Sequence, residues 1–212
     1  MLQFESETSN APDARPNAVD VYLNLPYDPD FAELLLVYIA GVVVHGLRPR
    51  AALEITGGER RLDRIIDLIR RCRYSVHDLT PPSGGLRLNM AFELALAVGH
   101  QRYRQDAHTW YVFETRRGRI ERTLSDLNGS DIFIHHGRPA HLFSELNNAF
   151  VRLNRQPGVT EMRLLLADLK DALPAILKRS GSKTPFTARV FADLRVLAAK
   201  LSGIAAEETP GV

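Results

Sequence analysis

Apolar and polar positions follow two different periods along the first 150 residues of the chain. Five short runs have the pattern of buried β-strands, and the segments between them repeat apolar side chains every three or four residues, as helices do. Because neighbouring parallel strands need crossover connections, this alternation predicts an α/β fold in which helices cover both faces of a parallel sheet. The predicted strands are 19–25, 50–55, 74–78, 110–114 and 131–135, and the predicted helices are 30–45, 60–72, 89–99 and 141–153.

The pattern changes near residue 160, after which strands stop and two helices are expected at 161–178 and 186–202. These helices have no strand to cover, so their apolar stripes must bury against the main domain or against another chain. The second alternative leads us to predict a homo-oligomer. The predicted division of the chain is a disordered tail at 1–18, a main domain at 19–156, a helical extension at 157–204 and a tail at 205–212.

Composition narrows the class of protein. Of the 212 residues, 45% are hydrophobic, which is enough for one sizeable core. The 27 basic and 25 acidic residues leave a net charge of +2, so no strongly basic surface indicates DNA or RNA as a partner. The longest uncharged apolar run, 34–44, is well short of the ~20 residues of a membrane span. We therefore expect no membrane partner, and nucleic-acid binding has no support.

Several kinds of site are also excluded by the sequence. Cys72 is the single cysteine, which is typical of a protein of the reducing cytoplasm, and residues 1–17 lack the features of a signal peptide. The adjacent His135 and His136 would point to opposite faces of a strand, so they cannot chelate one metal ion. Neither a G-x-G-x-x-G nor a Walker motif is present. We expect no metal and no resident cofactor.

Ligands of parallel α/β sheets bind beyond the carboxyl ends of the strands. In this chain four segments follow predicted strands or begin the helices after them, and they should face one crevice. The segments are 24–30, 56–61, 77–79 and 89–93.

Glu93 is the most informative residue of that crevice, because it is the only ionisable side chain in 89–99. A helical wheel places it in a seam between two apolar stripes. A carboxylate in such a seam either lines a pocket or pairs with a buried cation such as Arg64 or Arg87. We take the pocket as the working hypothesis, in which partial desolvation raises the pKa of Glu93. One stripe is Met90, Leu94, Ala97 and Val98, and the other is Phe92, Leu96 and Gly99.

A turn in the second segment has the groups to hold a phosphate. Gly57 and Gly58 offer backbone N–H groups, and Arg60 and Arg61 follow them at the start of a predicted helix. A Gly-Gly turn with solvated arginines is the ordinary alternative.

The ends of the first and third strands carry further candidates. Tyr27 and Asp28 follow the first strand, where they could stack on a base and bind a ribose hydroxyl, although Asp28 and Asp30 also suit a turn and a helix cap. Asp78 ends a short buried strand, which delivers it to the edge of the crevice, and a cap or turn role is its alternative.

Three segments of the chain together resemble a known family. They are VYLNLPYDPDF at 21–31, NMAFELALAVG at 89–99 and LSDLNG at 124–129. They resemble bacterial TIR-like predicted nucleotide-binding domains, which carry an aromatic and acidic loop at a strand end, an N-x-x-F-E-L-G-x-x-x-G helix and an S-D-L-x-G segment. The resemblance spans about residues 19 to 150, and it departs from the helix motif at Ala95, where the family usually has glycine.

The resemblance implies a flavodoxin-like or TIR-like three-layer fold with a five-stranded parallel sheet, plus a C-terminal helical pair, and a nucleotide ligand. The wider group includes TIR-domain NAD glycohydrolases and nucleoside 2-deoxyribosyltransferases, and both use a glutamate on the equivalent helix. By resemblance Glu93 is that catalytic glutamate, Asp78 is the nucleoside-contacting aspartate of the transferases, and 56–61 is the loop after the second strand of TIR domains. Asn89 stands where TIR enzymes commonly have serine or cysteine.

The expected function is therefore that of a nucleotide N-glycosidase, with NAD as the leading substrate. In this hypothesis Glu93 stabilises the ribosyl cation formed when the N-glycosidic bond breaks. One alternative is a non-catalytic nucleotide-sensing or assembly module, and another is transfer of deoxyribose between bases. The residues expected to bind the substrate are Tyr27 or Tyr22 at the base, Asp28 and Asp78 at the ribose, Gly57, Gly58, Arg60 and Arg61 at phosphate, and Asn89.

Overall fold

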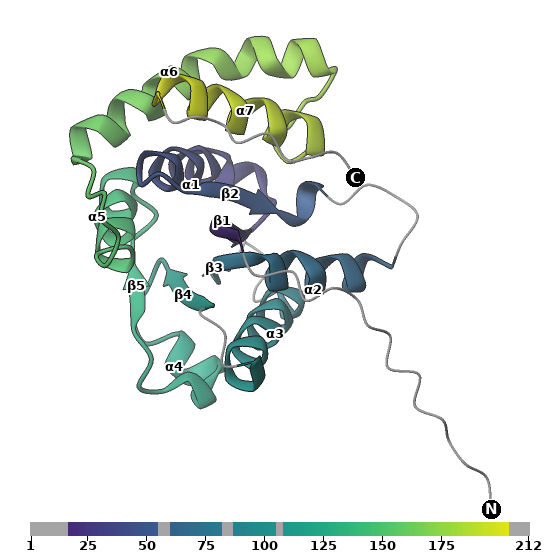
Figure 1. Ribbon diagram of the computed structural model, residues 1–212, viewed down its shortest axis with the longest axis vertical. Helices are drawn as coiled ribbons and strands as arrows, with labels where there is room; N and C mark the ends of the chain where they lie inside the picture. The colour runs from purple at the N-terminus through teal and green to yellow at the C-terminus, as the bar shows by residue number, and fades with distance from the viewer. Residues whose placement is uncertain (1–16, 55–59, 82–86, 105–107, 204–212) are drawn as a thin grey trace, which may run out of the picture.

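The computed structural model describes residues 17–54, 60–81, 87–104 and 108–203 of the chain (Figure 1). Five parallel strands form one sheet in the order β2-β1-β3-β4-β5, which is the flavodoxin-like order. The predicted five-stranded parallel α/β fold is confirmed. The strands are β1 (Asn17–Asn24), β2 (Arg48–Ala51), β3 (Cys72–Asp78), β4 (Thr109–Glu114) and β5 (Ile132–Ile134).

Helices cover both faces of the sheet. On one face α2 and α3 pack against β1 and β3, and on the other α1 and α5 pack against β2 and β5. The last two helices, α6 and α7, lie over α1 and add a further layer on that side (Figure 1). The helices are α1 (Ala32–Val44), α2 (Arg61–Arg71), α3 (Leu88–Arg104), α4 (Ile120–Thr123), α5 (Pro139–Ala149), α6 (Val159–Ser180) and α7 (Ala188–Leu201), with short 3-10 turns at Pro29–Phe31, Ala52–Glu54 and Ser125–Leu127.

Some predicted boundaries were wrong. The second strand ends at Ala51, because Ala52–Glu54 form a 3-10 turn in which the Glu54 carboxylate accepts hydrogen bonds from Ala51 N and Arg50 Nε. Cys72 is the first residue of β3 and does not end the helix before it, although it is fully buried, as expected of a small apolar side chain. The first strand begins at Asn17, inside the predicted tail.

Helix α1 forms the centre of the largest apolar core. Its middle residues are buried on every side because the sheet lies under it and α6 and α7 lie over it. At Gly41 the packing is so close that a β-carbon would lie 2.5 Å from Leu146 of α5. The uncharged run 34–44 is therefore a buried core helix. None of the described helices is both long enough and apolar enough to cross a bilayer.

The apolar stripes of the C-terminal helices are buried within the chain over most of their length, with Leu164 and Leu201 exposed. Leu169 of α6 and Phe191 and Leu194 of α7 are fully buried in the core that surrounds α1. Of the two partners considered for these stripes, the main domain is the one that covers them in the structure. The homo-oligomer stays a prediction, and these stripes no longer argue for it.

Candidate functional site

The end of β1 is tied directly to the start of α3. Asn24 Nδ2 donates to the carbonyl oxygen of Met90 at 2.9 Å and lies 3.0 Å from His77 Nδ1, in β3. The carbonyl can only accept, so the amide nitrogen must face it, and its second hydrogen is directed at His77. Asn24 thereby fixes the first turn of α3 against two strand ends, three residues before Glu93.

Glu93 lies under the sheet on the face covered by α2 and α3. Its Oε2 accepts a hydrogen bond from the hydroxyl of Tyr22 at 2.6 Å, and its side chain is only 7% exposed. Tyr22 is fully buried, so it has no free ring face for a base, and the idea that it stacks on one was wrong. Its role in the structure is to orient one oxygen of the Glu93 carboxylate.

The helical wheel around Glu93 was half right. The first predicted stripe, with Met90, Leu94 and Ala97, is buried against the sheet, and Glu93 belongs to this face. The second stripe is divided, since Phe92 is 52% exposed while Leu96 is partly buried against the core around α2. Glu93 therefore lies on the buried face of α3, next to a second stripe that is only partly exposed.

Burial raises the pKa of Glu93 above its ordinary value, and the hydrogen bond from Tyr22 and the charge of Arg61 offset this only in part. In the described part of the chain no cation lies within ion-pair distance of its carboxylate. Arg87, one of the two cations considered as its partner, pairs with Asp28 at 2.5 Å. The burial and the raised pKa agree with the expected partial desolvation. The pocket of the working hypothesis stays a prediction, because Glu93 lines none of the cavities formed by described residues.

Two further candidates lie in the electrostatic surroundings of Glu93. Burial raises the pKa of the half-buried Tyr27, the charge of Glu93 raises it further and Arg61 lowers it, so these groups are neighbours. The ring of Tyr27 also contacts Phe186, with ring centroids 5.7 Å apart. We call Tyr22, Tyr27, Arg61 and Glu93 the Glu93 cluster.

The remaining candidates at this edge lie around that cluster. Arg60 and Asn89 are exposed at the starts of α2 and α3. Asp28 carries a buried Oδ2 that accepts no hydrogen bond from the described residues, while its Oδ1 binds Arg87. Gly57 and Gly58 lie outside the described residues.

Asp78 is not brought to the Glu93 cluster. It points to the opposite face of the sheet, where its carboxylate accepts from Tyr38 Oη at 2.7 Å, from the backbone N–H of Thr80 at 3.0 Å and from His135 Nε2 at 3.0 Å. Gly137 N donates to His135 Nδ1, so the proton of the ring is on Nε2, which faces Asp78. We call Tyr38, Asp78, Thr80 and His135 the Asp78 cluster.

The electrostatics of Asp78 are opposite to those of Glu93. Burial alone would raise the pKa of Asp78, but His135, Thr80 and Tyr38 outweigh it and hold the pKa below its ordinary value. Asp78 is fully buried and its oxygens are occupied. Its geometry is that of a structural carboxylate, so a ribose contact would require this cluster to open.

Sequence reasoning missed a buried chain of polar groups beside Asn24. Because Asn24 donates to His77 Nδ1, His77 Nε2 donates to Ser75 Oγ at 2.9 Å, and Ser75 in turn lies 3.0 Å from His108 Nε2. Burial and His108 lower the pKa of His77 to about 3, so His77 is neutral at physiological pH. The only sequence signal was a pair of histidines next to strands, which does not show that they meet.

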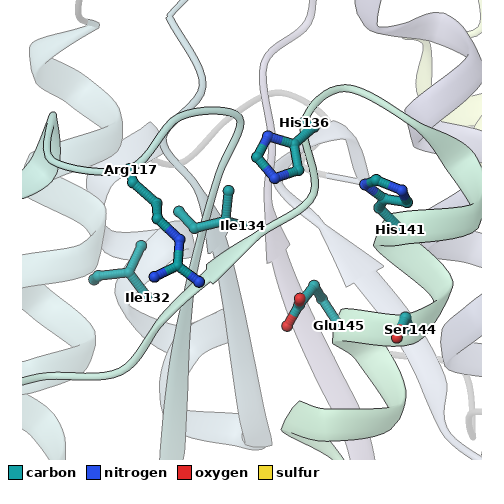
Figure 2. Close-up of a pocket in the computed structure, with 7 residues that line it drawn as sticks. All are labelled: Arg117, Ile132, Ile134, His136, His141, Ser144 and Glu145. Carbon is teal, nitrogen blue, oxygen red and sulfur yellow. The ribbon is translucent and has the colours of Figure 1, made fainter.

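Glu93 lines none of the cavities formed by described residues. One of about 350 Å³ lies beside β5, where Arg117 and two isoleucines face His141, Ser144 and Glu145 of α5, with His136 above (Figure 2). It carries charges of both signs, and the described residues contain no cluster of three or more His, Cys, Asp or Glu side chains placed to hold a metal ion. The segments 55–59 and 82–86, which adjoin the Glu93 cluster in the chain, lie outside the described residues.

Comparison with known proteins adds little to this geometry. No family model matches the chain, and no curated protein does. Among solved structures, the 2-desoxiribosyltransferase from Leishmania mexicana is similar, with 20% sequence identity, a TM-score of 0.44, and coverage of 60% of this chain and 96% of that one. At this distance the likeness carries no argument about function.

Proposed function

We propose that this protein cleaves the N-glycosidic bond of a nucleotide, with NAD as the leading substrate and Glu93 as the catalytic carboxylate. One observation carries the proposal: the Glu93 carboxylate is buried at the carboxyl edge of the sheet, with one hydroxyl donor and no paired cation in the described chain. A carboxylate with this surrounding is stabilised by a positive charge that develops next to it.

The chemistry needs one free carboxylate oxygen. Tyr22 donates to Oε2, which leaves Oε1 to face C1′ of the ribose. As the C1′–N bond of NAD breaks, its electron pair goes to the pyridinium nitrogen and neutral nicotinamide leaves. Glu93 stabilises the ribosyl cation or bonds to C1′, and water then adds at C1′ and loses a proton, which restores the carboxylate.

The absence of a paired cation among the described residues favours this reaction over simple binding. Burial destabilises the charged carboxylate in the free protein, and the ribosyl cation supplies the missing counter-charge only as the bond breaks. Glu93 therefore stabilises the transition state more than it stabilises the bound substrate.

Substrate contacts are proposed for the residues around the Glu93 cluster. Tyr27 would pack on a base, Asp28 Oδ2 would accept from a ribose hydroxyl, and Arg60 and Arg61 would bind phosphate oxygens. Asn89, exposed in the first turn of α3, would contact the substrate on the side of the nicotinamide leaving group. Gly57 and Gly58 remain in the proposal as phosphate-binding backbone. Asp78 is left out because of its buried contacts.

The test is nicotinamide release from NAD by the wild type, by Glu93→Gln and by Glu145→Gln, a control carboxylate on α5. We expect release by the wild type, a loss of about a thousandfold in Glu93→Gln and no change in Glu145→Gln. Equal release by the wild type and Glu93→Gln would remove Glu93 from the mechanism.

The acceptor is tested separately. When a deoxynucleoside and a different free base are supplied together, exchange of bases would identify a transferase, whereas free sugar identifies a hydrolase. If calorimetry shows that NAD binds but remains unchanged, the protein is a sensing module and the catalytic proposal is wrong.

A further inference from the structure

A cavity lined by described residues lies at the other end of the sheet, where β3, β4 and β5 begin. Its volume is about 470 Å³, and α5 ends beside it. Cavities that bind small molecules commonly measure about 300–1,000 Å³. Its aromatic residues pack on the face of the sheet opposite to Tyr22 and Glu93, so a ligand here would be a second one.

One wall of this amino-edge cavity is aromatic. Tyr74, Tyr111 and Phe133 come from three neighbouring strands and lie on the same face of the sheet. The rings of Tyr74 and Tyr111 are nearly parallel, with centroids 6.5 Å apart, and Phe133 meets Tyr111 edge-on at 5.9 Å. Phe150 closes the back of the wall, 5.3 Å from Tyr111. Such a wall favours a planar ring as the ligand.

Two arginines line the same cavity. The guanidinium carbon of Arg73 lies 5.5 Å from the centroid of the Tyr74 ring, and its buried Nη1 donates to no acceptor in the described chain. Neither Arg73 nor Arg152 forms an ion pair with the described carboxylates, including the exposed Asp131 at the rim. A buried guanidinium N–H without an acceptor is costly, and an anion would supply that acceptor.

The end of α5 does not oppose an anion strongly. Helix carboxyl ends carry partial negative charge on their last carbonyl groups. Here the carbonyl of Phe150, the residue after α5, accepts a hydrogen bond from Gln156 Nε2 at 2.9 Å. Two arginines against one exposed carboxylate leave the lining positive.

We propose that the amino-edge cavity binds a small aromatic anion, whose ring packs against Tyr74, Tyr111 and Phe133 and whose carboxylate or phosphate is held by Arg73 and Arg152. An aromatic carboxylate and a nucleoside monophosphate share this chemistry. The site is independent of Glu93, so it stands whether or not the protein cleaves a glycosidic bond.

The test is a titration of the full chain followed by amide chemical shifts in NMR. The probes are benzoate and adenosine monophosphate, each compared with a neutral analogue, benzamide and adenosine, and with inorganic phosphate as an anion without a ring. We expect shifts at residues 73, 74, 109 and 111, and binding of at least one aromatic anion about tenfold tighter than that of its neutral analogue and of phosphate. Benzoate alone would identify a carboxylate ligand, and the monophosphate alone a nucleotide.

Variants locate the site. Arg152→Gln removes an exposed guanidinium with little risk to folding, and Arg73→Gln removes the buried donor. Each should weaken binding of the aromatic anion about tenfold. Arg138→Gln, at an exposed arginine outside the cavity, is the control and should leave binding unchanged. Thermal unfolding of each variant checks that it folds. The proposal is overturned if neutral analogues bind as tightly as the anions, if Arg152→Gln binds unchanged, or if no shift appears at these amides. Nicotinamide release should be the same in all three variants, which separates this result from the proposed function.

Discussion

Two buried carboxylates lie at the same edge of the sheet, on opposite faces, and their surroundings differ. Asp78 and Glu93 each accept a hydrogen bond from a fully buried tyrosine, Tyr38 at 2.7 Å and Tyr22 at 2.6 Å. Asp78 has two further donors, whereas Glu93 has none in the described chain. The pKa of Asp78 is therefore lowered and that of Glu93 is raised.

The comparison shows that burial alone does not mark a reactive carboxylate. Both side chains are buried, but the donors of the Asp78 cluster compensate the charge of Asp78, whereas those of the Glu93 cluster compensate the charge of Glu93 only in part. Where the environments of two carboxylates push their pKa values apart, they have different roles. We infer that the Asp78 cluster stabilises the fold and that the Glu93 cluster binds a ligand.

The largest effect is expected from Asp78→Asn. The amide nitrogen of the asparagine is a donor, and it would face another donor in either orientation: Thr80 N in one, Tyr38 and His135 in the other. The free energy of unfolding should therefore fall by about 3 kcal/mol. Urea unfolding monitored by circular dichroism measures this.

The pH dependence of the same variant follows from the lowered pKa. The stability that Asp78 contributes is present above its ordinary pKa of 3.8 and is lost as the pH falls through the lower folded value. The difference between wild type and Asp78→Asn should therefore shrink below that pH. A loss under about 1 kcal/mol at neutral pH would show that the Asp78 cluster is not structural.

A smaller effect, on activity, is expected from Tyr22→Phe. Without its hydroxyl donor the Glu93 carboxylate loses orientation and its pKa rises further, so turnover should fall about tenfold and its acid limb should move to higher pH. The measurement is the pH profile of nicotinamide release.

Tyr38→Phe is the matched control, because it removes the same hydroxyl from the other carboxylate. It should reduce stability without moving the pH profile. If both variants shift the profile equally, the two clusters are not separate.

The smallest effect is expected on the stability of Glu93→Gln. Because the folded pKa of Glu93 is raised, the unfolding free energy of the wild type falls as the pH rises from the ordinary value of 4.5 through the folded pKa. The neutral amide avoids this cost and can still accept from Tyr22, so the variant should be more stable at neutral pH by about 1 kcal/mol. Destabilisation at neutral pH would instead indicate a structural carboxylate.

Part of this site could be predicted from the sequence. A single charged residue in an apolar run predicted that Glu93 is buried, and the rule for strand ends placed Tyr27 and Arg61 near it. The rule does not say to which face of the sheet a side chain at a strand end points. Asp78 follows His77, so the two point to opposite faces, and only His77 is linked to the Glu93 side through Asn24.

Contacts between distant segments were beyond the sequence. Tyr22 meets Glu93 across 71 positions, and the meeting of Ser75 with His108 depends on the register of β3 and β4. The fold was more accessible, because strand and helix periods are local properties. The place of α6 and α7 over α1 was one of two open alternatives, since an apolar stripe does not specify its partner.

The most direct test of the central claim is the titration of the Glu93 and Asp78 carboxyl carbons by NMR in the folded protein. We predict that the midpoint for Glu93 lies above 4.5 and that for Asp78 lies below 3.8. A Glu93 midpoint at or below 4.5 would show that its charge is compensated in the folded protein, and would contradict the role proposed for it.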